Sequence, residues 1–187
     1  MTNEPKDPKR VAAGKRSKAK GATWQRDVAK LLSDWSGETF KSTPRSGGLR
    51  WGGAFWVYGD LTPPADFPVV FECKHYATVD FLEILGTNQK DPGVGLVQKW
   101  YHEELLVDVL RASTELGIVA KGFLCWKPDH RRSRITMDLD LFNRFGIYTL
   151  VTVVTGVPGK TPFITLDLVT FLRSMTYEHF KSVILTP

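Results

Sequence analysis

The chain has 187 residues, of which 42% are hydrophobic and 12% aromatic, which is enough to bury the core of a single domain. Its apolar runs fall far short of the roughly 18 residues that a membrane span requires, and its polar first 20 residues lack the apolar centre of a secretory signal. The composition therefore predicts a cytoplasmic protein with no membrane partner. Because Cys73 and Cys125 are the only cysteines, we expect reduced core thiols rather than a disulfide framework.

Positive charge is concentrated in residues 1–20. Seven of the 25 basic residues and two of the 20 acidic residues lie there, which leaves 18 residues of each sign in the rest of the chain. Such a segment has too little apolar surface to fold alone, so we predict a disordered arm over 1–20 and one domain over 21–187. The arm is either a solubilising terminus or a segment that binds nucleic-acid phosphates; its candidate DNA-binding residues are Lys15, Arg16, Lys18 and Lys20.

Helical and strand periods alternate along the domain. The patterns predict, in chain order, a helix over 21–35, a strand over 39–43, a glycine-rich loop over 44–53, a hairpin over 54–76 with its turn at 62–66, a helix over 96–117, a strand over 118–127, a basic loop over 128–134, a strand near 148–154 and a helix near 165–175. This order indicates an α/β domain with a mixed central sheet flanked by helices. The segment 135–187 could complete the sheet or form a dimer surface.

Acidic residues flank the proline-rich turn at 62–66. If the hairpin turns at residues 65–66, positions whose numbers sum to about 132 face each other, and facing residues stand about 5 Å apart at Cβ. This register pairs Asp60 with Glu72. We therefore expect the two carboxylates to lie close together.

Lys74 joins these carboxylates because side chains alternate along a strand, which puts Glu72 and Lys74 on one face and Cys73 on the other. Two carboxylates so close repel each other, and a hard divalent cation such as Mg²⁺ relieves that repulsion. Charges at the end of an apolar strand are costly unless they are paired or bound to a metal. The pattern favours a metal site, with a plain cross-strand salt bridge as the alternative.

Three short motifs carry a family resemblance: "KGATWQRD" at 20–27, "PRSGG" at 44–48, and "GD" at 59–60 followed by "ECK" at 72–74. Together they resemble the PD-(D/E)xK nuclease superfamily, of restriction-endonuclease-like fold, and within it the archaeal-type Holliday junction resolvases and their phage-encoded relatives. Gly59 stands where the motif usually has proline. The resemblance covers residues 20 to about 126.

The resemblance implies roles for the residues of the third motif. Asp60 and Glu72 would be metal ligands together with the backbone carbonyl of Cys73, and Lys74 would be the catalytic lysine. The implied cofactor is Mg²⁺, with Mn²⁺ as a substitute. Gln25 occupies a catalytic position where the resolvases usually carry a glutamate; as glutamine it brings no charge, and it could instead be an ordinary helix-surface residue.

Two further segments could contact DNA. By resemblance, Ser46 touches the scissile phosphate, with Arg45 and Arg50 beside it in a loop that could also cradle phosphate; as an alternative, all three are ordinary polar residues of a loop. The basic loop over 128–134 is either a solvated loop or a second contact to the DNA backbone.

The sequence thus predicts a metal-dependent, structure-selective DNA endonuclease. By resemblance its substrate is a four-way or branched junction of DNA recombination, cut by phosphodiester hydrolysis, and two symmetric cuts imply a homodimer. If the protein is phage-encoded, it works in the host cytoplasm. The alternatives are a nuclease of the same fold acting on linear duplex or single-stranded DNA, and a non-catalytic DNA-binding protein.

Overall fold

The computed structural model describes residues 7–43, 58–65, 67–79, 95–147, 153–155 and 160–186. The predicted loop over 44–53, with Arg45, Ser46 and Arg50, lies outside these residues. The helices and strands are, in chain order, α1 (Pro8–Ser36), β1 (Lys41–Ser42), β2 (Leu61–Thr62), β3 (Val69–Tyr76), α3 (Leu96–Lys99), the π-helical η1 (Trp100–Leu105), α4 (Leu106–Leu116), β4 (Lys121–Pro128), β5 (Arg134–Asp138), α5 (Leu139–Phe145), β6 (Val153–Thr155), β7 (Phe163–Asp167), α6 (Leu168–Arg173) and α7 (Tyr177–Leu185).

The predicted mixed sheet is present. Five strands are hydrogen-bonded in the order β3-β4-β5-β7-β6, with β3 and β4 parallel and every other pair antiparallel. The parallel pair is joined through α3, η1 and α4, as parallel strands require a long crossover. Strands β1 and β2 form a separate antiparallel pair. β3 is therefore an edge strand of the five-stranded sheet, and its outer side is open to other parts of the chain.

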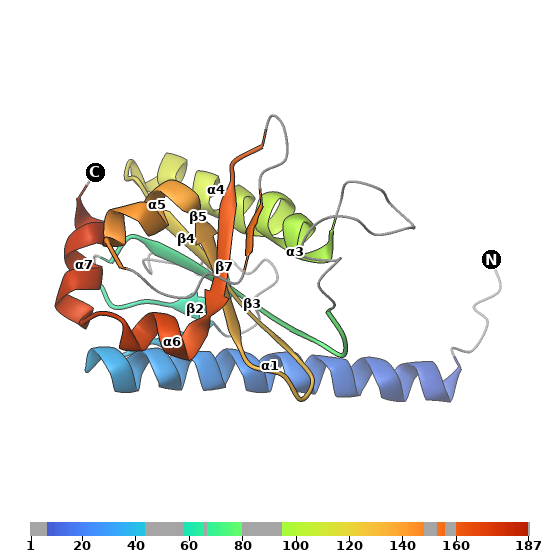
Figure 1. Ribbon diagram of the computed structural model, residues 1–187. Helices are drawn as coiled ribbons and strands as arrows, with labels where there is room; N and C mark the ends of the chain where they lie inside the picture. The colour runs from blue at the N-terminus through green and yellow to red at the C-terminus, as the bar shows by residue number, and fades with distance from the viewer. Residues whose placement is uncertain are drawn as a thin grey trace.

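Helices cover both faces of this sheet, and the side chains of β3 show how they divide. Val69, Phe71 and Cys73 belong to the core cluster that includes α1, α5, α6 and α7, whereas Val70 belongs to the cluster built from α3, η1 and α4. Figure 1 shows α1 along one side of the sheet and α3 and α4 along the other. Glu72 and Lys74 alternate with Cys73, so they stand on the side of η1 and α4.

Helix α1 is longer than the sequence predicts. It begins at Pro8, so residues 8–20, for which the sequence predicts a disordered arm, are helical in the structure. The segment is rich in lysine, arginine and alanine, which are strong helix formers. Because the amphipathic part that follows packs on the core and supplies the helix nucleus, extending it backward avoids the cost of nucleation. Figure 1 shows the first turns of α1 projecting beyond the rest of the fold.

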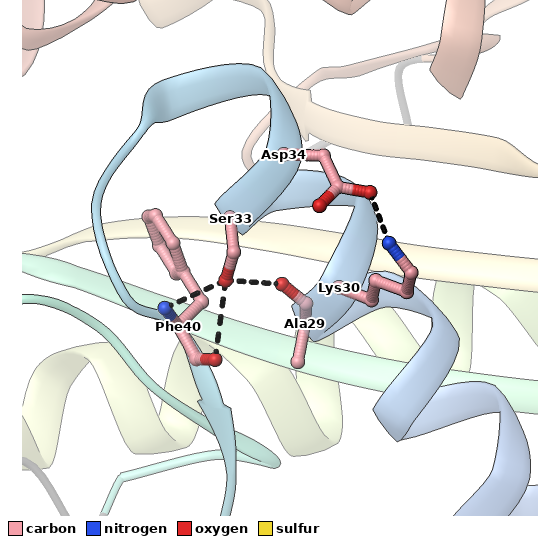
Figure 2. A network of polar contacts seen from close by, with 5 residues as sticks. All are labelled: Ala29, Lys30, Ser33, Asp34 and Phe40. Atoms are coloured by element: carbon pink, nitrogen blue, oxygen red, sulfur yellow. Dashed lines mark hydrogen bonds and ion pairs between the residues drawn. The ribbon is translucent and has the colours of Figure 1, made fainter.

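The end of α1 is fixed by Ser33, as Figure 2 shows. Its hydroxyl group accepts a hydrogen bond from the backbone N–H of Phe40 at 2.9 Å and lies 2.8 Å from the carbonyl oxygen of Ala29, to which it donates. Gly37 follows in the left-handed conformation with φ 72°, as a helix-terminating glycine does. These contacts turn the chain directly from α1 into β1, the short strand that the sequence predicts.

The C-terminal third differs most from the prediction. The predicted helix near 165–175 is the strand β7 followed by the helix α6, and β5, α5 and α7 are not predicted at all. Of the predicted strand near 148–154, only Val153 and Val154 lie within the described residues, in β6. Asp138 and Asp167 each accept a hydrogen bond from a backbone N–H at the start of the next helix, so both helices begin at the end of a strand.

Residues 135–186 complete the sheet, since β5, β7 and β6 are three of its five strands. Within the residues that the structure describes, no helix combines the length and the apolar character needed to cross a membrane.

Candidate active site

Asp60 reaches β3 through a parallel contact and not through the predicted hairpin. Gly59 forms a parallel bridge with Phe71, and the backbone N–H of Asp60 donates to the Phe71 carbonyl at 2.7 Å. The predicted antiparallel register of Asp60 with Glu72 is therefore wrong. The reason is the pairing of β2 with β1, which takes residues 61–62 out of a hairpin with β3.

The side chain of Asp60 completes this contact. Its Oδ2 accepts a hydrogen bond from the backbone N–H of Cys73 at 2.9 Å, and the residue is only 6% exposed. In a strand the N–H and the C=O of one residue point to the same side. The Cys73 carbonyl therefore also points to the open side of β3, where Asp60 lies.

Gly59 is required for this close approach. Its φ is 76°, and a Cβ atom placed there would lie 2.4 Å from the Phe71 carbonyl oxygen. Proline, which the superfamily motif usually has at this place, is locked near φ −65° and could not adopt this conformation. Glycine in place of the usual proline therefore agrees with the local structure, because the backbone has a positive φ and passes close to Phe71, which only glycine allows.

Lys74 is held between two carboxylates. Its Nζ lies 2.6 Å from Oε1 of Glu72 and 2.5 Å from Oε2 of Glu104. The side chains of Glu72 and Lys74 are 12% and 23% exposed, and that of Glu104 is 41% exposed. The three groups thus form a cluster that opens to solvent on the side of Glu104.

The charges of this cluster act on one another. Burial, and then the negative charge of Asp60, raise the pKa of Glu72 to about 7, although Lys74 opposes the shift. Burial would lower the pKa of Lys74, but the carboxylates of Glu72 and Glu104 raise it well above its ordinary value. Lys74 is therefore a fixed cation, while Glu72 carries a charge that the protein alone does not fully compensate.

These residues fit a hard divalent cation. Asp60 and Glu72 are close enough for the charge of one to raise the pKa of the other, and the Cys73 carbonyl points to the same edge. Within the described residues no group of three or more His, Cys, Asp or Glu side chains could hold a metal ion. A set of two carboxylates and a carbonyl is instead typical of Mg²⁺, which binds few protein ligands and keeps several waters.

Gln25 is not on the same face as Glu72 and Lys74. It is half-buried on α1, beside Trp24, whose indole N–H donates to the Cys125 carbonyl at 3.0 Å. Helix α1, which carries Gln25, packs on the Cys73 face of the sheet, the face opposite to that of Lys74. Asp27 is exposed on the outer side of the same helix.

The basic residues of α1 differ in their surroundings. Lys15, Arg16 and Lys18 are exposed to solvent. Lys20 forms an ion pair with Asp129 at 2.5 Å, and His75 contacts the other oxygen of this carboxylate at 2.8 Å.

Sequence reasoning missed Glu104. The residue lies in η1 between Tyr101 and Leu105, which are both buried in the core, so packing on either side fixes its position. A π-helical turn is rare and occurs often at functional sites, but no local pattern distinguishes it from an ordinary helix. The sequence feature that could have identified Glu104 is its place at the border of the apolar stripe of the predicted helix over 96–117.

Comparison with known proteins agrees with this geometry. Residues 16–102 match the model of the family described as "Phage putative PDDEXK endonuclease". The matched range contains residues 16–36 of α1 together with Asp60, Glu72 and Lys74, and it ends two residues before Glu104. No curated protein and no solved structure matches the chain. The match covers 87 of the 187 residues. Over this segment the chain is similar to PD-(D/E)xK endonucleases, and its α/β restriction-endonuclease-like fold agrees with that similarity.

Proposed function

We propose that the protein is a Mg²⁺-dependent DNA endonuclease, with Mn²⁺ as a substitute, that cuts branched or four-way DNA. The observation that carries the proposal is the cluster of Asp60, Glu72 and Lys74 at the open edge of β3. It places two carboxylates and a fixed cation together inside the segment that matches the nuclease family. Such a set suits the hydrolysis of a phosphodiester bond.

Each residue has a part in this proposal. Asp60, Glu72 and the Cys73 carbonyl would hold the cation, which when bound would activate a water molecule and stabilise negative charge on the phosphate. Lys74, kept protonated by its carboxylate partners, would orient the attacking water or neutralise charge that develops on the phosphate. Glu104 would hold Lys74 in place. Gln25 would contribute at most a neutral oxygen from the other side of β3.

The choice of branched DNA rests on the resemblance of the three motifs to those of junction resolvases. Ser46, Arg45 and Arg50 would contact the scissile phosphate and its neighbours, as the motif "PRSGG" suggests. Two symmetric cuts in one junction would require two active sites, so a homodimer is part of the same proposal. The family match supports nuclease chemistry but carries no information on the shape of the DNA.

Cleavage assays test the proposal. The wild-type protein is incubated with a synthetic four-way junction, with its linear duplex arms and with single strands, each with Mg²⁺, Mn²⁺ or a chelator. Asp60→Asn and Lys74→Ala are the test variants, and Asp27→Asn, which changes an exposed carboxylate of α1, is the matched control. Preferred, divalent-dependent cutting of the junction that only the test variants lose supports the proposal.

The other outcomes distinguish the rivals. Equal cutting of junction and linear duplex assigns the protein to a nuclease without structure selectivity. Binding of DNA without cutting under any metal condition identifies a non-catalytic DNA-binding protein.

A further inference from the structure

The β4–β5 turn is fixed against α1 by several contacts. Asp129 lies in this turn, and its carboxylate binds both Lys20 of α1 and His75 at the end of β3. Its backbone N–H donates to the Tyr76 carbonyl at 2.9 Å. On the preceding strand, the ammonium group of Lys127 lies over the ring of Trp24, 5.7 Å from its centroid. The turn and the helix thus form one continuous surface.

Exposed cations lie on both parts of this surface. Arg16 is exposed about one turn before Lys20 on the same side of α1, and Lys15 and Lys18 are exposed beside it on other sides of the helix. Arg131 and Arg132 are exposed in the β4–β5 turn. No ion pair within the described part of the chain involves any of these five residues. Asp129, the acidic residue of the turn, is already bound by Lys20 and His75. The surface is therefore positively charged without internal compensation.

The geometry points to a binding surface for the sugar-phosphate backbone of duplex DNA, formed by α1 and the β4–β5 turn together. This inference rests on the proposed function and names the part of the protein that holds a DNA arm. The DNA backbone is the ligand that fits this surface by charge complementarity, because clustered lysine and arginine side chains neutralise phosphates. The side chains are long and exposed, so they would grip the backbone without reading the base sequence.

The rigidity of the helix gives the surface its reach. The 13 residues from Pro8 to Lys20 extend over about 20 Å at 1.5 Å per residue, which matches about six base pairs of duplex at 3.4 Å each. Figure 1 shows this part of α1 projecting past the fold, with the β4–β5 turn against the helix. A disordered arm of the same charge would have to lose conformational freedom on binding, whereas a preformed helix does not.

The surface lies at the C-terminal ends of β3 and β4, where the candidate active site also lies. His75, which binds Asp129, follows Lys74 directly, on the opposite face of β3. A duplex held by α1 and the β4–β5 turn would therefore run past the end of the sheet that carries Lys74. The surface would hold the DNA arm while the edge of β3 meets the phosphate to be cut.

Binding of a short linear duplex in the presence of a chelator tests this inference without cleavage. The full-length wild-type protein is compared with Lys15→Gln/Arg16→Gln on the helix and with Arg131→Gln/Arg132→Gln in the turn. Lys160→Gln/Arg173→Gln is the matched control, since it removes two exposed cations outside this surface. Affinity is measured by fluorescence anisotropy over a range of salt concentrations, and circular dichroism checks that each variant is folded.

Each basic-surface variant should weaken binding about tenfold or more at low salt and reduce the slope of log affinity against log salt by up to about 1.8, at roughly 0.9 per lost phosphate contact. The control should retain the wild-type slope. Two results would contradict a surface formed by both elements. One is an equal salt slope in all proteins, and the other is a loss of DNA affinity in only the helix variant or only the turn variant. Wild-type protein that binds in this way but never cuts DNA contradicts the proposed function and leaves the surface intact.

Discussion

Lys74 and Glu104 form an ion pair between β3 and η1, with Nζ and Oε2 2.5 Å apart. Glu72 is the other partner of Lys74, and burial together with the charge of Asp60 raises its pKa to about 7. A metal cation bound by Glu72 would neutralise its carboxylate, and Glu104 would then remain as the carboxylate partner of Lys74. The three carboxylates of Asp60, Glu72 and Glu104, against one ammonium group, carry two net negative charges, which is the charge that a divalent cation balances.

Glu104→Gln should therefore lower kcat about 10-fold to 100-fold, as expected when a catalytic group loses its position, while KM for DNA changes little. The change in unfolding free energy should stay below about 1 kcal/mol because the Glu104 side chain is partly exposed. Steady-state cleavage kinetics and thermal unfolding measure the two effects. Glu103→Gln, which removes the same charge from the exposed neighbour, is the control and should behave as wild type. Equal kcat values for the two variants would refute a positioning role for Glu104.

Gly59→Ala should separate Asp60 from β3. An added Cβ would lie 2.4 Å from the Phe71 carbonyl oxygen, in a backbone conformation that alanine rarely adopts. The expected loss is about 2–4 kcal/mol of unfolding free energy and most of the cleavage activity, measured by chemical denaturation and a nuclease assay. Gly37→Ala is the control, because Gly37 has a similar φ of 72° but nothing within 4 Å of the added atom. If both variants lose the same stability, the close contact with Phe71 has no role.

The raised pKa of Glu72 makes the stability of the metal-free protein depend on pH. Its pKa is about 7 in the folded protein, against 4.5 for an unperturbed glutamate, so the folded state binds the proton more tightly than the unfolded state. Stability from this group is present below pH 4.5 and is lost as the pH rises to about 7, by at most about 3 kcal/mol. Glu72→Gln should remove this part of the pH dependence in denaturant unfolding experiments with a chelator.

Divalent cations should reverse this trend. Because a cation competes with the proton for Glu72, Mg²⁺ or Mn²⁺ should stabilise the wild-type protein more at about pH 8 than at about pH 5.5, as read from the thermal unfolding midpoint. Glu72→Gln should lose most of this stabilisation. A metal-induced shift that is the same at both pH values in the wild type would argue against Glu72 as a ligand.

The periodicity of the sequence is sufficient to predict the strand and the helix that bring Glu72, Lys74 and Glu104 together. The apolar segment before Glu72 predicts β3, and its alternation correctly puts Glu72 and Lys74 on one face. The helix over 96–117 is present as α3, η1 and α4, which run on without a break. Both elements are long and strongly patterned, which is where sequence periodicity is most informative.

Features that depend on distant contacts could not be predicted in this way. The place of Asp60 follows from the pairing of β1 with β2, which are separated by a long stretch of sequence and have two residues each. The helical arm depends on the packing of the downstream part of α1, which supplies the nucleus that a polar, highly charged segment lacks on its own. The ion pair of Lys74 with Glu104 joins residues 30 positions apart, which a search for motifs near the "ECK" segment does not reach.

Titration of the full-length protein with Mg²⁺ or Mn²⁺ by isothermal calorimetry, without DNA, tests the central claim most directly. The account predicts saturable binding to the wild type and to Asp27→Asn, and at least a tenfold weaker affinity for Asp60→Asn, whose side chain can still accept the Cys73 hydrogen bond. Binding of equal strength to Asp60→Asn and to the wild type would contradict a metal site at the edge of β3.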